Sequence, residues 1–291
     1  MADFVDALMA DRYLDHKYKA PLLGDFPLPD EAFVSEWAAW LEGRDEGFPD
    51  EVRTLLSREA TKVWLEKTPA GKIPVVYAED RRIFERLTAV LSREDKKEGK
   101  EENEERRLPV SVNAFTVPCK HPSFPKHRVI CLAEAGYSAL SGEDVGIKNE
   151  EWLEKSAAIR LHHECCHYFT LRALGGMKNH ALDEVMADCV GQLAAFGRYD
   201  ASLQRKFFGL KNFNSKDFDP KDFGIVQGGR LGFYVKNLPG GAVPLVCRKV
   251  DEALDALEGY LEKNSEMAET SHRPELIVKL ATLGLAGITE L

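Results

Sequence analysis

The feature that most constrains this chain is the segment 160–176, which contains two histidines and a glutamate in the pattern His-Glu-x-x-His. On an α-helix, which turns about 100° per residue, His163 and His167 lie one turn apart on the same face. Their imidazole rings can therefore bind one metal ion. Glu164 lies about 100° round the axis from His163, so its carboxylate can reach a water molecule on that ion instead of binding the ion itself. This is the geometry that a zinc hydrolase requires.

Apolar or small residues lie on almost every side of this helix. They are Ile159, Leu161, Cys165, Cys166, Phe169, Leu171 and Leu174. A helix of this kind is expected to be buried, and buried histidines need partners for their ring nitrogens. The pattern arises by chance in roughly 2% of chains of this length and composition. The alternative interpretation is a solvated helix that carries the two histidines and the glutamate without binding a metal.

A second acidic pair follows in the segment 182–190, where Glu184 and Asp188 are four residues apart and share a helix face. Glu184 can supply a third ligand to the ion, while Asp188 can accept a hydrogen bond from the ring N–H of one histidine. The connection between the two helices, Gly175 to Asn179, is short, and helices joined in this way usually pack antiparallel. That packing brings the start of the second helix next to the histidines.

With these residues the chain resembles the gluzincin metallopeptidases, the thermolysin-like group with HExxH on one helix and ExxxD on the next. The resemblance covers about residues 150–200. It implies one zinc ion held by His163, His167 and Glu184, with Glu164 as general base and Asp188 as the carboxylate that orients a ligand histidine. The gap between His167 and Glu184 is shorter than in thermolysin, which implies a tight connection between the two helices.

Other side chains near the motif have less suitable positions. His162 points away from the metal face by the rotation of one residue, which favours a core or surface role. His180 could compete with Glu184 as third ligand, although it lies too far along the chain for the metzincin spacing. Cys165 and Cys166 are expected to be small buried hydrophobic residues, and a metal-ligand or redox role for either of them stays open.

The composition excludes several classes of partner. With 44% hydrophobic and 30% charged residues, it indicates an ordinary soluble globular protein. A formal net charge of −9 and the absence of a basic stripe disfavour nucleic acid and anionic membranes. The acidic N-terminal residues do not resemble a signal peptide, and no apolar run reaches the ~18 residues of a spanning helix. We therefore expect a cytoplasmic protein with reduced cysteines.

The hydrophobic periodicity predicts a helix-rich α+β fold. The resemblance implies that its small sheet, together with the active-site helix and the glutamate helix, is zincin-like. Four regions are expected: a mainly helical region at 1–92, a charged connector at 93–107, the metal-binding core at 108–200 and a mainly helical region at 201–291. The expected helices outside the motif are 1–20, 30–43, 50–67, 80–92, 246–263 and 274–285, and the expected strands are 71–78, 108–117 and 127–133.

Caps and edges can also be predicted. Asp30 is expected to cap the helix that follows it, and Asn179 to cap the glutamate helix, which ends before Gly197. For the histidine helix, Asn149 or Ser156 could be the cap. Pro74 favours an edge position or a strand start for 71–78.

The strand predicted at 127–133 lies just before the histidine helix. By resemblance to thermolysin-like enzymes, it could be the edge strand that pairs with an extended peptide substrate. In physical terms, an open edge near the ion could bind a peptide backbone by strand addition. Alternatively, the chain's own loops cover that edge.

These patterns predict a zinc-dependent metallopeptidase that hydrolyses peptide bonds of a peptide or protein substrate, with Glu164 as general base for the zinc-activated water. Such an enzyme needs a donor for the oxyanion, and the candidates are Tyr199, Arg198, Arg230 and Tyr234. Two alternatives stay open. One is a non-catalytic binding module that is stabilised by metal, and the other is a zinc hydrolase of a non-peptide amide or ester.

Overall fold

The computed structural model describes residues 2–19, 25–44, 48–91, 114–118, 127–211, 224–226 and 229–291. The fold is α+β and rich in helices. Its sheet is mixed, has four strands in the order β1-β2-β4-β3, and consists of β1 (Thr61–Thr68), β2 (Gly71–Ala78), β3 (Ala114–Pro118) and β4 (Arg128–Ala133). The α-helices of the described residues are α1 (Ala2–Leu14), α2 (Phe33–Leu41), α3 (Asp50–Leu56), α4 (Arg81–Leu91), α5 (Gly142–Val145), α6 (Asn149–Ala173), α7 (Ala181–Phe196), α8 (Ala201–Phe208), α9 (Leu231–Val235), α10 (Ala242–Lys263) and α11 (Arg273–Ile288).

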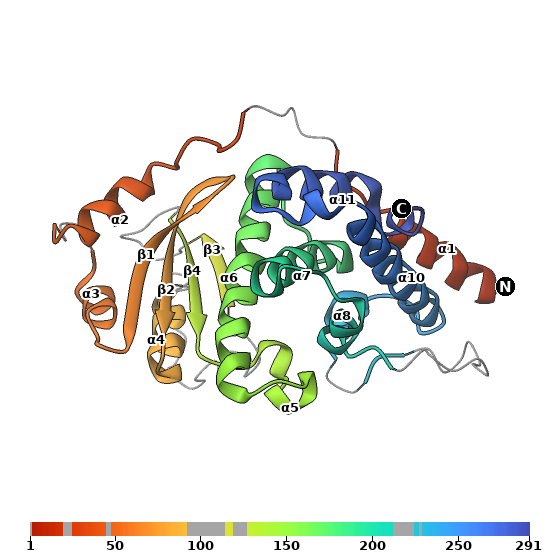
Figure 1. Ribbon diagram of the computed structural model, residues 1–291, viewed down its shortest axis with the longest axis horizontal. Helices are drawn as coiled ribbons and strands as arrows, with labels where there is room; N and C mark the ends of the chain where they lie inside the picture. The colour runs from red at the N-terminus through yellow and green to blue at the C-terminus, as the bar shows by residue number, and fades with distance from the viewer. Residues whose placement is uncertain are drawn as a thin grey trace, which may run out of the picture.

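Helix α6 lies between the sheet and the other large helices, with α2, α3 and α4 on the far side of the sheet (Figure 1). The residues of the central strands alternate between two cores. In β4, Val129 and Cys131 pack with α2, α3 and α4, whereas Ile130 and Leu132 pack in the core that contains α6 and α7. Because side chains alternate along a strand, a strand buried on both faces is apolar throughout. The central strands of the sheet are therefore buried on both faces, and one of these faces packs in the core that contains α6.

The start of the chain packs against its end. Helix α1 lies beside α10 and α11, far from α2, so the chain crosses the molecule between its first two helices (Figure 1). Ala10 and Leu14 of α1 are buried in the same core as α10 and α11, and Tyr18 N donates a hydrogen bond to Ala281 O at 2.9 Å. Gly284, with φ +71°, interrupts α11 where a Cβ atom would lie 2.6 Å from His16 O. The N-terminal segment is thus part of the helical half of the molecule.

Helices α6 and α7 pack closely, and the later a residue lies in α6, the earlier its contact lies in α7. Gly191 faces Ile159, where a Cβ atom on the glycine would lie only 2.8 Å from the Ile159 carbonyl oxygen. Further along, Asp188 contacts His163. The contact of Glu184 with His167 completes the series. The antiparallel packing expected from the short connection is confirmed by this order of contacts.

Several predicted elements are confirmed, including the strand 71–78 and the helices at 80–92, 246–263 and 274–285. The helix predicted over 50–67 is wrong. Helix α3 ends at Leu56, and β1 follows at Thr61 and pairs along its whole length with β2, from Thr61 opposite Ala78 to Thr68 opposite Gly71. The β-branched and aromatic residues of this segment pair with a strand, and this pairing outweighs its helical spacing. The first 92 residues are therefore less helical than expected, and they supply half of the sheet.

The predicted edge strand is also wrong. Strand β4 lies inside the sheet, parallel to β2 and antiparallel to β3, and β3 is the edge strand on that side. Pro74, expected at an edge or strand start, lies within β2 opposite Leu65. It is tolerated because pairing with β4 begins only at Val75, so the missing N–H of the proline costs no bond in that ladder.

The predicted helix caps are wrong as well, and three of the four side chains bond to other groups. Asp30 Oδ1 accepts a hydrogen bond from Lys72 N at 2.7 Å, and Asn149 Oδ1 accepts one from Gly142 N at 2.7 Å. Ser156 lies within α6, where its Oγ accepts a hydrogen bond from Tyr137 N at 2.9 Å. Instead of Asn179, His180 caps α7. The predicted end of α7 at Gly197, which has φ +70°, is confirmed.

The charged connector predicted at 93–107 lies outside the described residues, as does part of the strand predicted at 108–117. Among the residues described, no helix is both long enough and apolar enough to cross a membrane.

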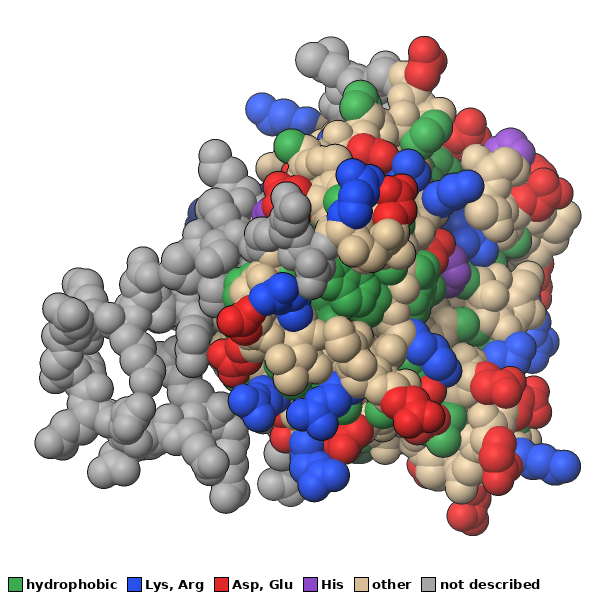
Figure 2. All heavy atoms as spheres, turned by 90° about the vertical axis from the view of Figure 1, so that its left-hand side faces the viewer, with side chains coloured by type: hydrophobic (Ala, Val, Ile, Leu, Met, Phe, Trp, Pro, Cys, Tyr) green, Lys and Arg blue, Asp and Glu red, His purple; other side chains and the backbone are tan. Residues whose placement is uncertain are grey.

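On the face shown in Figure 2, acidic and basic side chains are interspersed around hydrophobic ones. Exposed ion pairs such as Lys62–Glu79, at 2.6 Å, contribute little to stability. The buried cores are what hold the fold together.

Candidate metal centre

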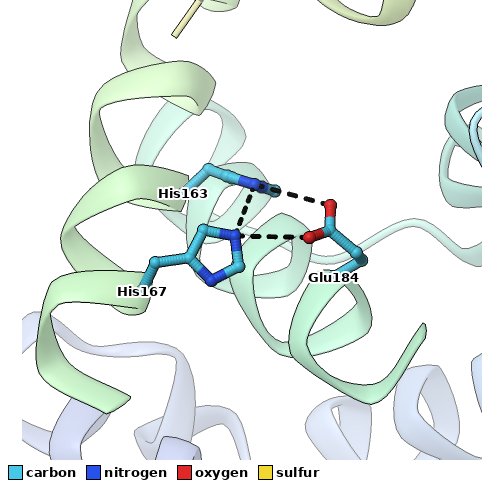
Figure 3. Close-up of side chains that lie close together, drawn as sticks. All are labelled: His163, His167 and Glu184. Atoms are coloured by element: carbon cyan, nitrogen blue, oxygen red, sulfur yellow. Dashed lines mark hydrogen bonds and ion pairs between the residues drawn. The ribbon is translucent and has the colours of Figure 1, made fainter. Parts of the chain in front are cut away.

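Three buried side chains from α6 and α7 point toward one another (Figure 3). The Nε2 atoms of His163 and His167 are 3.0 Å apart. Glu184 Oε2 lies 3.6 Å from His163 Nε2, and Glu184 Oε1 lies 3.4 Å from His167 Nε2. Each of the three residues is only 6% exposed. Within the described part of the chain, these residues form the one cluster of three or more His, Cys, Asp or Glu side chains with the spacing of a metal site.

The dimensions of this cluster fit a small divalent ion. Zinc binds histidine nitrogen and carboxylate oxygen at about 2.0–2.1 Å with tetrahedral geometry, which separates neighbouring ligand atoms by about 3.3–3.4 Å. The three separations given above, 3.0, 3.4 and 3.6 Å, lie close to that value. Two imidazoles and one carboxylate are also a donor set that zinc favours. The side chains present therefore fit a zinc ion.

The charges of the cluster are strongly coupled. Burial alone would raise the pKa of Glu184, but the hydrogen bond with His167 and the nearby His163 hold this pKa well below its usual range. Burial alone would lower the pKa of His167, but the hydrogen bond and the charge of Glu184 raise it to about 9. Without an ion, the proton on His167 therefore balances the charge of Glu184.

Asp188 contacts His163 on the side of the ring that faces away from Glu184. Its Oδ1 atom is 2.8 Å from His163 Nδ1, which leaves Nε2 of the same ring facing Glu184. Burial would raise the pKa of Asp188, but the charge of Arg230 and the hydrogen bond with His163 lower it below its usual value. Arg230 reaches Asp188 Oδ2 through NH2 and donates from NH1 to Tyr137 Oη at 2.7 Å. Asp188 is thus an ionised carboxylate that holds one histidine in place.

Glu164 follows His163 directly on α6 and is 8% exposed. Its carboxylate contributes to the raised pKa of His167, so its charge acts on the cluster. This is the residue of the motif that does not belong to the three converging side chains.

The four candidate oxyanion donors have different environments. Burial and the nearby charge of Glu184 raise the pKa of the Tyr234 hydroxyl on α9. Arg230 is engaged by Asp188, as described above. Arg198 is largely exposed and lies 3.9 Å from Asp200. The buried hydroxyl of Tyr199 meets no hydrogen-bond partner among the described residues. The structure therefore brings Tyr234 and Arg230 to the centre, and it places Arg198 on the surface.

The remaining candidates near the motif lie away from the cluster. His180 caps α7, where its Nδ1 accepts a hydrogen bond from Leu182 N at 3.1 Å. Its Nε2 donates to Tyr13 O at 3.0 Å, and its ring stacks on the Tyr13 ring. Burial lowers the pKa of both His162 and His180 to about 4. Cys165 and Cys166 are buried, and burial raises the pKa of both thiols. None of these four residues joins the three-residue cluster.

Comparison with known proteins places the chain in a family. Residues 92–290 match a family of unknown function, DUF7005. The chain belongs to this family. No curated protein matches the chain, and no solved structure matches it. The region matched to DUF7005 contains the motif helices and Arg230, whereas α1, Tyr18 and the hairpin of β1 and β2 lie before it.

Tyr137 and Gln204, which lie within the DUF7005 match, are two residues of the centre that the sequence motifs do not indicate. Tyr137 Oη donates to Asp188 Oδ1 at 2.5 Å, and Gln204 Nε2 donates to Asp188 Oδ2 at 2.6 Å. They are 51 and 16 residues from Asp188 along the chain. The only hint in the sequence is indirect, because a buried carboxylate must find several donors.

Proposed function

We propose that this protein is a zinc-dependent metallopeptidase of zincin-like architecture. The observation that carries the proposal is the convergence of two imidazole nitrogens and one carboxylate, buried and separated by 3.0–3.6 Å, on two adjacent helices. His163, His167 and Glu184 would hold the ion. When bound, a zinc ion in such a site makes its water molecule acidic and polarises a carbonyl group.

The other roles follow from position. Glu164, one residue along from His163, takes the proton of the attacking water and then gives it to the leaving amine. Asp188 fixes the orientation of the His163 ring. Tyr234, whose hydroxyl is buried and feels the charge of Glu184, is the candidate donor for the oxyanion. The proposed substrate is a peptide or an unfolded protein, and the proposed location is the cytoplasm.

One observation favours a second candidate function. The three proposed ligands and Glu164 are only 6–8% exposed, which is also the condition of a metal site that serves folding alone. A non-catalytic module stabilised by metal is therefore the competing proposal. The two are separated by hydrolysis, because both predict bound zinc.

The decisive experiment compares wild-type protein with Glu164→Gln and with Glu154→Gln, which makes the same substitution at an exposed position of α6. Zinc content and hydrolysis of an unfolded protein, such as reduced and alkylated casein, are measured for each. We expect one zinc per chain in all three proteins. We expect hydrolysis to fall by about 10²–10⁴-fold in Glu164→Gln alone, which is the range for loss of a general base.

Equal hydrolysis by Glu164→Gln and wild type would refute the assigned base. Zinc in all three proteins without hydrolysis of peptide substrates would support the non-catalytic module. Wild-type protein that binds no zinc would contradict both proposals.

A further inference from the structure

The Asp188 carboxylate is the centre of a buried hydrogen-bond network that reaches well beyond the proposed ligands. It is fully buried, and four side chains from separate parts of the chain contact it. They are His163 of α6, Tyr137 of the 3₁₀ turn after β4, Gln204 of α8 and Arg230 before α9. A buried carboxylate with this many partners is held in one orientation.

The direction of the Tyr137 hydrogen bonds follows from Arg230, since a guanidinium group can only donate. Arg230 NH1 donates to Tyr137 Oη at 2.7 Å. The hydroxyl therefore directs its own hydrogen elsewhere, and two atoms are within reach: Asp188 Oδ1 at 2.5 Å and His163 Nδ1 at 2.9 Å. The carboxylate oxygen is the nearer and carries the negative charge, so it accepts the hydrogen. Arg230 NH2 donates to Oδ2 of the same carboxylate.

The orientation of the Gln204 amide follows from a second chain of hydrogen bonds. The backbone N–H of Asp200 can only donate, and it donates to Gln192 Oε1 at 2.9 Å. Gln192 Nε2 consequently donates to Gln204 Oε1 at 3.1 Å. This leaves Gln204 Nε2 facing Asp188 Oδ2 at 2.6 Å. Both amides are therefore oriented by a backbone group, and Asp188 receives donors only.

These directions leave one role for His163. The Nδ1 atom of His163 lies 2.8 Å from Asp188 Oδ1 and 2.9 Å from Tyr137 Oη, whose own hydrogen goes to Asp188. Both oxygens therefore act as acceptors toward Nδ1, and Nδ1 must carry the hydrogen. The Nε2 atom of the same ring then has a free lone pair, which points toward His167 Nε2 and Glu184. This is the tautomer that a metal ligand needs.

We propose that Tyr137 and Gln204 are positioning residues, which together with Arg230 hold Asp188 as an acceptor and so fix the metal-binding tautomer of His163. Tyr137 also acts on His163 directly, since its Oη lies 2.9 Å from Nδ1. This inference rests on the proposed function in so far as it concerns zinc. The backbone around Tyr137 is consistent with a dedicated position: Ser138 and Ala139, which follow it, have φ values of +51° and +59°, which non-glycine residues rarely adopt.

The test uses Tyr137→Phe, which removes one hydroxyl group and keeps the ring. The matched control is Tyr168→Phe. Tyr168, which lies on α6, is buried like Tyr137, and its hydroxyl donates to Glu31 at 2.9 Å, away from Asp188. A second variant, Gln204→Met, removes the amide and keeps a side chain of similar length. Zinc affinity is measured by competition with a chromophoric chelator.

We expect zinc affinity to fall about 10–100-fold in Tyr137→Phe and in Gln204→Met, the range for loss of a group that orients a ligand, and to be unchanged in Tyr168→Phe. A second readout needs no metal. In metal-free protein with ¹⁵N-labelled histidine, long-range ¹H–¹⁵N spectra report which nitrogen of His163 carries the hydrogen, and a His163→Gln variant assigns the signals. Wild type should show the Nδ1–H form, and Tyr137→Phe a mixture of both tautomers.

The outcomes separate this inference from the proposed function. Unchanged zinc affinity in both Tyr137→Phe and Gln204→Met, with zinc bound by wild type, would overturn the positioning role alone. An Nε2–H tautomer of His163 in metal-free wild type would also overturn it. If wild type binds no zinc, the proposed function fails, and the tautomer spectra still decide whether Tyr137 and Gln204 position His163.

Discussion

Zinc affinity should depend on pH in a way that the structure sets. In the metal-free protein, the carboxylate of Glu184 outweighs the effect of burial and raises the pKa of His167 to about 9. The sign follows directly. Below pH 9 the imidazole is protonated, zinc binds only the neutral form, and each bound ion must displace this proton. The affinity should therefore rise with pH and become level above about pH 9.

The magnitude follows from the same pKa. Between pH 7 and a pKa of about 9 lie two units, and one unit corresponds to 1.36 kcal/mol. Proton competition at His167 should thus weaken zinc binding at pH 7 by about 100-fold, or about 3 kcal/mol. The apparent dissociation constant should fall about tenfold for each unit between pH 7 and 9.

The assay is chelator competition from pH 7 to 10, combined with titration calorimetry at pH 7 in buffers of different ionisation enthalpy. We expect one proton to be released from His167 for each zinc bound. His162→Gln is a suitable control, since burial lowers the pKa of His162 to about 4 and this residue is outside the cluster. A zinc affinity that does not change between pH 7 and 9 would show that the proposed pairing of His167 with Glu184 is wrong.

Three further outcomes are expected. Gly191→Ala should lower the free energy of unfolding by about 1–3 kcal/mol in denaturant titrations, because its Cβ atom would lie 2.8 Å from the backbone oxygen of Ile159. His180→Ala should lower the same quantity by about 1 kcal/mol, because α7 loses the cap that accepts from Leu182 N. Free zinc at 100 times the dissociation constant should raise the free energy of unfolding of wild type by about 2.7 kcal/mol, and it should have no such effect on His163→Ala.

The convergence of the two helices was predictable because its information is local. His163 and His167 are one helical turn apart, as are Glu184 and Asp188, and a short connection leaves the helices few ways to pack. The burial of α6 was predictable from its apolar residues. These features depend on neighbours within a few residues, so the sequence alone was sufficient.

The segment Thr61–Thr68 shows where local information fails. Val52, Leu55 and Leu56 have helical spacing and are buried in α3, and the same spacing can be continued into the next segment. That segment instead forms β1, because β2 offers it a complete antiparallel partner. Pairing between strands is a property of two segments together, and the spacing within one of them does not reveal it.

The surroundings of Asp188 were unpredictable for a related reason. Tyr137 and Gln204 belong to elements with no shared periodicity with α7, and they meet its carboxylate only in the folded chain. Arg230 was a candidate for the oxyanion, but in the structure it pairs with Asp188. The type of residue was informative, since a buried acid needs donors, but the sequence does not show which donors will reach it.

The buried acidic side chains of helix α7 depend on partners from several parts of the chain. It buries three acidic side chains, and buried carboxylates are costly unless each has a partner. The partners come from distant segments: Tyr18 donates to Asp183, whose pKa burial raises to about 6, while Glu184 meets His167 and Asp188 meets Arg230. A hairpin of α6 and α7 alone would lack the partners of Asp183 and most of those of Asp188. The N-terminal segment and the residues before α9 must therefore pack against α7 if Asp183 and Asp188 are to keep these partners.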